Sequence, residues 1–387
     1  MQKTAFSTAL PPLMLQPLSF PPDYTAAPMS FERDNIRQLA PYVPGEQPQA
    51  GVVKLNTNEN PYPPADAVLD AIRAVDGDSL RRYPTPRSEM FRQIAADVHG
   101  LSPEQVIATN GGDELLRLVF TVFTEPGDGG GGGGGGVGVT DPTYSLYPVL
   151  ARIQDTALFA VPRNDEFGLP EDFADRLNDA GCRLAMIVNP HAPSGRIEMV
   201  DTLARVAEGF NGVLLIDEAY VDFAEHDALP LLHRGHENVI LLRTLSKGYS
   251  LAGLRFGYGL SSPDLIEILD KARDSYNMDA IAQAAACAAL THRDVAAQSW
   301  SKVKDERTRV SEELNRRGFD VIPSQTNFIL ARASDDDAAR TLYESLKQKN
   351  IFVRYFEQDR LRDKLRITIG TQQQNDQLLD AIDQLIG

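Results

Sequence analysis

The feature that most constrains the fold is a repeated alternation of short apolar runs with segments of helical periodicity. The runs are "QVIAT" (105–109), "VGVT" (137–140), "LAMIV" (184–188), "VLLI" (213–216) and "NVILLR" (238–243). Strands that are apolar at almost every position are typical of a sheet covered on both faces, and helical connections between them indicate parallel pairing. The sequence therefore predicts an α/β fold with a mostly parallel sheet flanked by helices.

A polar segment follows each of these runs directly. In chain order the segments are "NGGDE", "DPTY", "NPHAPSG", "DEAY" and "TLSKGYS". Ligands of open parallel sheets bind beyond the carboxyl ends of the strands. We therefore expect the five segments to meet at one crevice.

The pattern changes after residue 290, where a long polar helix (293–317) precedes the strand-like runs "FDVIP", "NFILA", "IFVR" and "LRITI". This pattern of a long helix followed by short strands predicts a smaller α+β domain. We expect a flexible tail at 1–31, an N-terminal arm at 32–62, a large domain at 63–290 and a small domain at 291–387.

Composition excludes several classes of protein. A formal charge of -16 argues against a nucleic-acid partner, which usually meets a basic face. The prolines and scarce basic residues of the first thirty positions do not fit a signal peptide, and no run reaches membrane-spanning length. With only Cys182 and Cys287, neither a disulfide framework nor a cysteine-based metal site is expected, and the pair of histidines in "HRGH" (233–236) lacks a third ligand. We expect a cytoplasmic protein without a metal.

Lys247 is the strongest chemical signal. It comes directly after an apolar run, beside the hydroxyls of Thr244 and Ser246, with Arg255 eight residues further on. Most lysines are surface residues, and one at a buried strand end is costly unless its amine is used. Bonding to a carbonyl cofactor is one such use.

The stretch "SKGYSLAGLR" resembles the S-K-x-x-x-L-A-G-x-R motif of the fold type I, pyridoxal-phosphate-dependent aminotransferases, and "IDEAY" supplies Asp217 and Tyr220 in the family's order. The resemblance implies that Lys247 binds pyridoxal 5'-phosphate covalently. It also implies that Asp217 keeps the pyridine nitrogen protonated and that Tyr220 bonds the ring oxygen.

The resemblance places further residues around the cofactor. "TNGGDELLRLVFTVF" predicts an amphipathic helix that begins near Asp113, whose free amides at Gly112 and Asp113 form an anion site. The cofactor phosphate is expected there, with Thr244, Ser246 and Arg255, while Tyr144 stacks on the ring.

One segment departs from the family. "NPHAPSG" (189–195) resembles N-P-N-N-P-T-G, but Ala192 stands where most members have the asparagine that bonds the ring oxygen. Either Asn189 or His191 replaces it, or Tyr220 serves alone.

The N-terminal pieces "RDNIRQLAPY" (33–42), "KLNTNENPYPP" (54–64) and "RRYPTP" (81–86) resemble histidinol-phosphate aminotransferases. That subgroup implies a homodimer, with the arm packing on the small domain and on the partner. By this resemblance Tyr42 and Asn58 line the substrate site, and Tyr83 reaches the cofactor phosphate of the neighbouring subunit.

The same subgroup places Arg354 and Arg366 at its two anion-binding positions. The expected reaction transfers an amino group between histidinol phosphate and 2-oxoglutarate in histidine biosynthesis, a small-molecule donor and acceptor. Alternatives on the same scaffold are an aromatic amino acid aminotransferase and a threonine-phosphate decarboxylase. A non-catalytic regulator is a weaker alternative, because the chain has no appended helix-turn-helix.

The eight glycines Gly129–Gly136 invite comparison with a phosphate-binding loop. A Walker-type loop needs Lys-Ser/Thr and a helix directly after its glycines, and here a strand is expected instead. We interpret the run as a loop expansion at the edge of the sheet away from the site.

Overall fold

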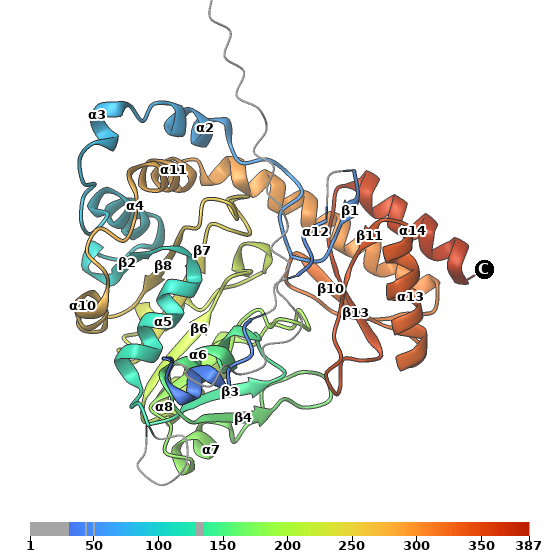
Figure 1. Ribbon diagram of the computed structural model, residues 1–387, viewed down its shortest axis with the longest axis horizontal. Coiled ribbons are helices and arrows are strands. Elements are labelled where there is room, and N and C mark those ends of the chain that lie inside the picture. Colours follow the sequence, from blue (N-terminus) through green and yellow to red (C-terminus); the bar gives the residue numbers. More distant parts are fainter. Residues whose placement is uncertain (1–30, 43–44, 49–50, 128–134, 387) are drawn as a thin grey trace, which may run out of the picture. The chain divides into compact units, whose positions relative to one another are not determined.

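The computed structural model describes residues 31–42, 45–48, 51–127 and 135–386. The chain forms two compact units, Met1–Gln38 and Leu39–Gly387. The described part of the first unit contains α1 (Asp34–Arg37), in which Arg37 pairs with Asp34 at 3.1 Å. Residues 1–30 of the expected tail lie outside the described residues. All other elements belong to the second unit, and Figure 1 labels most of its helices and strands.

A seven-stranded sheet, in the order β2-β8-β7-β6-β5-β3-β4, forms the centre of the second unit. Its strands are β2 (Val106–Thr109), β3 (Val137–Asp141), β4 (Leu158–Pro162), β5 (Leu184–Val188), β6 (Val213–Asp217), β7 (Val239–Thr244) and β8 (Gly257–Leu260). β8 pairs antiparallel with β2 and with β7, while the other neighbouring strands of this sheet pair in parallel. All five predicted strands are confirmed, and so is the mostly parallel α/β sheet.

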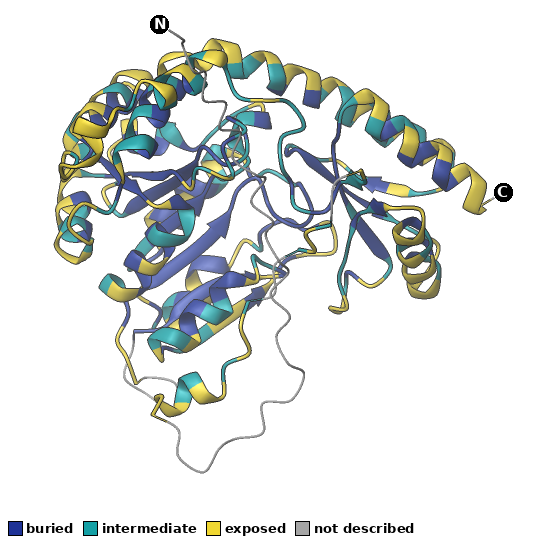
Figure 2. Ribbon diagram, turned by 45° about the horizontal axis from the view of Figure 1, so that its top comes forward, coloured by how far each residue is buried: buried dark blue, intermediate teal, exposed yellow. Residues whose placement is uncertain are grey.

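Along the parallel strands, successive side chains are buried alternately in two different apolar clusters. In β5, Leu184, Met186 and Val188 belong to one cluster, while Ala185 and Ile187 belong to the other. The first cluster includes side chains of α5 (Gly111–Phe123), α6 (Leu146–Gln154) and α10 (Pro263–Ala272). The second includes side chains of α2 (Asp66–Arg73), α4 (Glu89–His99), α7 (Phe173–Asp179), α8 (Val200–Gly209), α9 (Leu229–His233) and α11 (Ala280–Thr291). Helices therefore cover both faces of the sheet, and Figure 2 shows its strands buried, apart from the largely exposed edge strand β4.

Three shorter helical segments complete this part of the chain: α3 (Gly77–Leu80), η1 (Pro103–Gln105) and η2 (Val221–Phe223). We refer to residues 66–291 as the main region and to residues 293–386 as the C-terminal region. Within the described residues no helix is long and apolar enough to cross a membrane.

The C-terminal region begins with α12 (Arg293–Arg316) and contains a four-stranded antiparallel sheet in the order β12-β13-β10-β9. Its strands are β9 (Asp320–Ile322), β10 (Phe328–Arg332), β12 (Arg354–Tyr355) and β13 (Lys364–Thr368), and its other helices are α13 (Asp336–Gln348) and α14 (Gln372–Ile386). The run "IFVR" was expected as one strand. It divides at the buried Val353, because β11 (Ile351–Phe352) pairs with β1 (Val53–Lys54) and β12 joins the sheet.

The glycine run falls largely outside the described residues, which resume at Gly135. Gly135 donates its backbone N–H to Gly181 O at 2.9 Å, and the backbone N–H of Arg183 donates to Gly136 O at 3.0 Å. Both glycines precede β3 at its amino end. That end is opposite to the carboxyl end, where ligands of parallel sheets bind.

Candidate active site

A cavity of about 430 Å³ lies at the carboxyl edge of the seven-stranded sheet. All five polar segments contribute to its lining, so the predicted convergence is confirmed. From these segments the lining residues include Gly112, Asp113, Thr143, Tyr144, Ser145, Ala192, Pro193, Asp217, Ala219, Tyr220, Thr244, Ser246 and Lys247. Other residues of the main region, among them Arg255, also line the cavity, and the rest of the wall comes from the C-terminal region and from Tyr42, Gly45, Gln47 and Asn56–Glu59.

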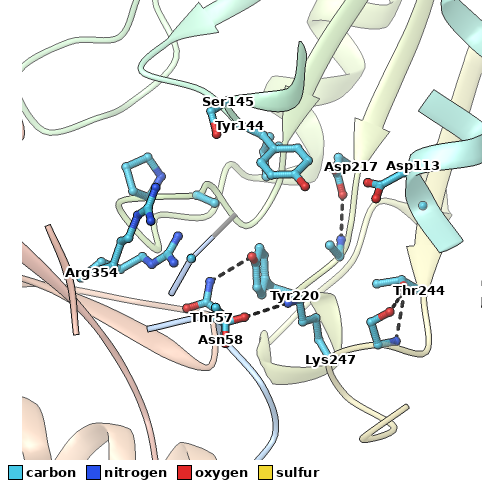
Figure 3. Close-up of a pocket in the computed structure, with 18 of the residues that line it drawn as sticks. Thr57, Asn58, Asp113, Tyr144, Ser145, Asp217, Tyr220, Thr244, Lys247 and Arg354 are labelled. Atoms are coloured by element: carbon cyan, nitrogen blue, oxygen red, sulfur yellow. Dashed lines mark hydrogen bonds between the residues drawn. The ribbon is translucent and has the colours of Figure 1, made fainter. Parts of the chain in front are cut away.

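Lys247 follows β7 at the centre of this cavity (Figure 3). Its Nζ donates to the carbonyl oxygen of Thr57 at 3.1 Å and lies 6.0 Å from the centre of the Tyr220 ring. Burial, helped by the positive charge of Arg366, lowers the pKa of this amine to about 8. At neutral pH the Lys247 amine is therefore much closer to its neutral, nucleophilic form than an exposed lysine is.

Asp217 ends β6 and is held by two donors. The hydroxyl of Tyr147 donates to its Oδ2 at 2.9 Å, and the backbone N–H of Ala219 donates to its Oδ1 at 3.0 Å. Burial raises the pKa of the carboxyl to about 6, although both hydrogen bonds oppose that rise. The acid is thus fixed in orientation while its charge remains poorly solvated.

Tyr147 was not identified from the sequence. It is fully buried on α6, one turn after Tyr144, and its place in "DPTYSLY" was the only signal available. Residues three apart on a helix lie on the same face. Predicting a helix that starts within this segment would therefore have placed Tyr147 beside Tyr144, near the site.

Tyr220 and Asn58 are joined by a hydrogen bond of 3.0 Å, in which Asn58 Nδ2 donates to the phenol oxygen. Asn58 adopts a left-handed backbone conformation with φ 56°. The C-terminal region stabilises this conformation, because Thr368 bonds both its backbone N–H and its Oδ1, and Asn327 Nδ2 donates to its carbonyl. Asn58 therefore fixes the Tyr220 hydroxyl from outside the sheet.

The start of α5 forms a polar cradle beside Lys247. The helix begins at Gly111, two residues before Asp113, and Gly111 itself adopts φ +74°, a left-handed conformation that glycine adopts readily. A Cβ at Gly111 would lie 2.7 Å from Arg255 Nη2, so glycine lets the guanidinium approach the helix start. Arg255 bonds Ser246 Oγ at 3.4 Å and Asp113 Oδ2 at 3.3 Å. Such a helix start with a guanidinium beside it favours an anion.

The hydroxyls of the cradle are linked to one another. Thr244 Oγ1 donates to Ser246 Oγ at 3.0 Å and accepts from the Ser246 backbone N–H at 3.1 Å. Two hydroxyls are thereby fixed at the end of β7, next to Lys247.

The rings of Tyr42 and Tyr144 form an aromatic part of the cavity wall. Tyr144 meets Tyr42 edge to face at 6.1 Å and Tyr147 at 5.6 Å between ring centres. Both Tyr42 and Tyr144 line the cavity, as expected. Burial raises the pKa of Tyr144, which therefore stays neutral.

Arg354 and Arg366 face the cavity from the C-terminal region. They are direct partners across β12 and β13, and both guanidiniums lie near the ring of Phe356, at 5.4 and 5.5 Å from its centre. Arg366 donates to Asn56 O at 2.9 Å, while its buried Nε has no hydrogen-bond partner. Among the residues that the structure describes, neither arginine has an acidic side chain in ion-pair contact. Two arginines left without carboxylates in an acidic chain are suited to an anionic ligand.

Two expected residues are not brought to the cavity. Asn189 Oδ1 accepts the backbone N–H of Glu198 at 2.7 Å, and the His191 ring bonds Ser194 Oγ at 2.7 Å and Pro142 O at 2.9 Å. The Asn189 side chain is buried within its own loop, and the His191 ring is buried between that loop and Pro142. Neither is among the described residues that line the cavity, whereas Ala192 is.

Tyr83 is also outside the cavity of its own chain. Its side chain is 81% exposed and stacks on Tyr276 at 4.5 Å between ring centres. Nothing within the described residues brings this ring to Lys247 of the same chain.

Comparisons with known proteins agree with this geometry. The chain is 45% identical over 359 residues to histidinol-phosphate aminotransferase 1 of Trichormus variabilis, covering 92% of this chain and 99% of that protein. A solved structure of histidinol-phosphate aminotransferase from Sinorhizobium meliloti in complex with pyridoxal-5'-phosphate has a TM-score of 0.84 at 29% identity, covering 92% and 98% of the two chains. L-threonine-O-3-phosphate decarboxylase from Porphyromonas gingivalis, at 20% identity and a TM-score of 0.73 over 87% and 99%, shares the fold.

The family model for aminotransferase class I and II matches residues 50–382, which include every strand of both sheets and all the described cavity-lining residues except Tyr42, Gly45 and Gln47. This match spans most of the chain. The chain therefore belongs to the class I and II aminotransferases.

Proposed function

We propose that this chain is a pyridoxal-phosphate-dependent histidinol-phosphate aminotransferase of histidine biosynthesis. It exchanges an amino group between histidinol phosphate and 2-oxoglutarate, giving imidazole-acetol phosphate and glutamate. The observation that carries the proposal is one cavity that combines a buried lysine of lowered pKa, a buried carboxyl and two arginines that have no acidic partner within the described part of the chain. The names of the relatives that are 40 to 45% identical support the substrate.

The residues present fit pyridoxal phosphate. The cradle at Gly111 would be filled by a Cβ, and the lining atoms Thr57 Oγ1 and Asn56 Oδ1 are buried without hydrogen-bond partners. Gly112, Asp113, Thr244, Ser246 and Arg255 would hold the phosphate, and Tyr144, Asp217 and Tyr220 would hold the ring. When bound, the cofactor supplies an aldehyde that bonds to amines and a ring that accepts an electron pair from the substrate carbon.

The protein residues supply the acid–base chemistry. The Lys247 amine, kept close to neutral by burial, can accept a proton from a substrate carbon and return it. The Asp217 carboxylate, held by Tyr147 and Ala219, is oriented to accept a hydrogen bond from a protonated ring nitrogen.

Tyr220 is the residue we assign to the ring oxygen in place of the asparagine missing at Ala192. Because Asn58 Nδ2 donates to the Tyr220 oxygen, the phenol's own hydrogen remains available for a second partner. The side chains of Asn189 and His191 are already bonded within their loop.

Arg354 and Arg366 explain how one site accepts two different anions. Histidinol phosphate has a phosphate and no carboxylate, whereas glutamate has carboxylates. A planar guanidinium binds either group through paired hydrogen bonds. Tyr42 and Asn58 line the same cavity and would contact the rest of the substrate.

A homodimer in the cytoplasm is part of the proposal. Leu80, Tyr83, Met90 and Tyr276 are apolar or aromatic and from 42 to 81% exposed. Exposed apolar side chains that lie close together favour contact with a protein partner. We propose that this partner is a second copy of the chain, whose cofactor phosphate Tyr83 would reach.

The shared site is tested by mixing Tyr83→Ala and Lys247→Ala chains, each inactive by itself. The mixture should regain activity, since one site of a mixed dimer carries neither change. Persistent inactivity of a mixture that forms mixed dimers would remove the shared-site proposal.

Substrate choice is tested by steady-state rates with glutamate as donor and imidazole-acetol phosphate or phenylpyruvate as acceptor. We expect the phosphorylated acceptor to have a kcat/KM at least tenfold higher, since it alone supplies a phosphate to the arginines. A preference for phenylpyruvate would favour the aromatic alternative, and carbon dioxide release from phosphothreonine would favour the decarboxylase.

A further inference from the structure

Arg360 connects the C-terminal region to the main region beside the cavity. Its Nη1 donates to the carbonyl oxygens of Arg163 at 2.8 Å and Asp141 at 3.4 Å, and its Nη2 donates to Asn164 O at 2.6 Å. These carbonyls belong to the ends of β3 and β4 and the turn that follows. The rigid, planar guanidinium presents several donors in fixed directions, which suits it to engage three main-chain oxygens at once.

The receiving turn, 164–168, is itself fixed. Asn164 Oδ1 accepts the backbone N–H groups of Glu166 at 3.1 Å and Gly168 at 2.7 Å, and Arg163 Nη1 donates to Phe167 O at 2.8 Å. Phe167 has φ 61°, a conformation that bulky residues rarely adopt without support. The turn is therefore held in one shape before Arg360 meets it.

An apolar cluster accompanies the polar contact. The Phe167 ring is buried against Leu330 and Leu361, with Phe356 packed at its edge, and the Arg360 guanidinium lies 5.1 Å from the ring centre. Leu361 and Phe356 are neighbours of Arg360 in the chain, while Phe167 belongs to the main region. Two kinds of contact thus join the regions at one place.

The segment between Arg354 and Arg366, here called the strap, carries much of the substrate-facing wall. Arg354, Phe356, Gln358, Leu361 and Arg366 all line the cavity. Arg360 is not among the lining residues that the structure describes, although residues on both sides of it are. It therefore anchors the strap from outside the site.

We propose that Arg360 is a positioning residue that seats the strap on the main region, so that Arg354 and Phe356 stand at the correct place to receive the substrate's anionic group. This inference rests on the proposed function. Without the Arg360 guanidinium, the strap keeps its own strands and its apolar contact with Phe167, but loses its hydrogen bonds to Asp141, Arg163 and Asn164. Substrate binding then weakens, while the groups around Lys247 are unaffected because none of them touches Arg360.

The test compares Arg360→Met with Arg362→Met. Arg362 lies in the same strap, is also positively charged, and bonds only within the strap, to Asp359 at 3.2 Å and Glu357 O at 3.1 Å, among the contacts of the described residues. Losing charge-assisted hydrogen bonds should raise the KM for histidinol phosphate and for 2-oxoglutarate about tenfold in Arg360→Met, with kcat within about threefold. The control should stay within twofold on both.

Two further measurements separate positioning from general stability. Arg360→Lys keeps the charge but offers a single point of donation, so its KM should fall between wild type and Arg360→Met. Hydrogen exchange of the backbone in 354–363 should quicken in both Arg360 variants and not in Arg362→Met, at unchanged cofactor absorbance. An unchanged KM in Arg360→Met, or a loss confined to kcat, would overturn the inference. Failure of the proposed function would show differently, as absence of turnover in the wild-type enzyme.

Discussion

The two walls of the cavity are held in different ways. On the sheet side the reactive groups are fixed by short-range hydrogen bonds at strand ends, as Asp217 is by Tyr147 and Ala219. On the C-terminal side, Arg354 has no ion-pair partner among the described residues, and the strap that carries it meets the main region through Arg360. The difference suggests that the sheet side sets the chemistry, while the strap side sets affinity and is the more adjustable of the two.

The largest effect is expected from Lys247→Ala, which removes the base of the sheet-side wall. Turnover should fall by at least about a thousandfold, since covalent and general-base roles are lost together. The visible absorbance of the enzyme-bound cofactor should change with it. Lys271→Ala, an exposed lysine paired with Glu267, is the control and should retain full activity. Full turnover of Lys247→Ala would refute the assignment.

Arg366→Met should affect mainly binding, with a smaller effect on chemistry because the Arg366 charge helps to lower the pKa of the Lys247 amine. Loss of a guanidinium that grips an anion should raise the KM for histidinol phosphate and for 2-oxoglutarate about 30-fold, with the cofactor absorbance retained. Steady-state kinetics with both substrates measure this. A 30-fold fall in kcat with unchanged KM would show that Arg366 acts in the chemical step. The two walls would then not differ in the way proposed.

Asp217→Asn tests how much stability the cofactor-free protein loses by burying the charge of Asp217. The folded pKa of about 6 lies above the ordinary value of 3.8, so folding favours the protonated acid. Wild-type stability therefore falls as pH rises from about 4 to 6 and stays low above that window. The asparagine variant should gain about 2 kcal/mol relative to wild type between pH 4 and pH 8, measured by urea unfolding. A difference that does not depend on pH would contradict the buried, raised carboxyl.

Tyr147→Phe should have a modest effect, because it removes one donor from Asp217 and leaves the ring in place. The loss of one hydrogen bond to a buried carboxylate should lower kcat about three- to tenfold and raise the pKa of Asp217 further. Tyr343→Phe, whose ring stacks on Tyr355 in the C-terminal region, is the matched control. Equal effects of the two substitutions would argue against an orienting role for Tyr147.

Shortening Gly129–Gly136 to two glycines should have the smallest effect. Changing a loop's length costs only about 0.6 kcal/mol per doubling, and β3, which follows the run, meets the cavity at its opposite end. We expect turnover to remain within twofold of wild type. A large loss of activity with the fold preserved would give the run a role that our interpretation denies.

The same contrast explains what the sequence could reveal. The five strands and their loops were predictable because an apolar run and the polar segment after it are local patterns. The edge strand β4, half exposed, and β8, "GYGL" with two glycines, lacked such a pattern. Both are recognised only through pairing with distant strands.

Contacts between distant segments account for the other differences. Asn189 is the right residue type near the right place, but Glu198 nine residues later bonds its side chain within the loop. Arg360 donates to backbone carbonyl oxygens about 200 residues earlier in the chain. Every residue has such an oxygen, so the amino-acid sequence does not reveal which ones Arg360 contacts. Motifs therefore predicted which sheet-side residues line the cavity, whereas the contacts of Arg360 with the main region required the folded structure.

The central claim is that Lys247 joins the cofactor within this cavity. Borohydride reduction of the cofactor-loaded enzyme, followed by proteolysis and mass spectrometry, tests it most directly, because reduction makes the lysine–cofactor bond permanent. We predict that the phosphopyridoxyl group is recovered on the peptide that contains Lys247 and on no other. Recovery on a different lysine, with Lys247 unmodified, would contradict the account.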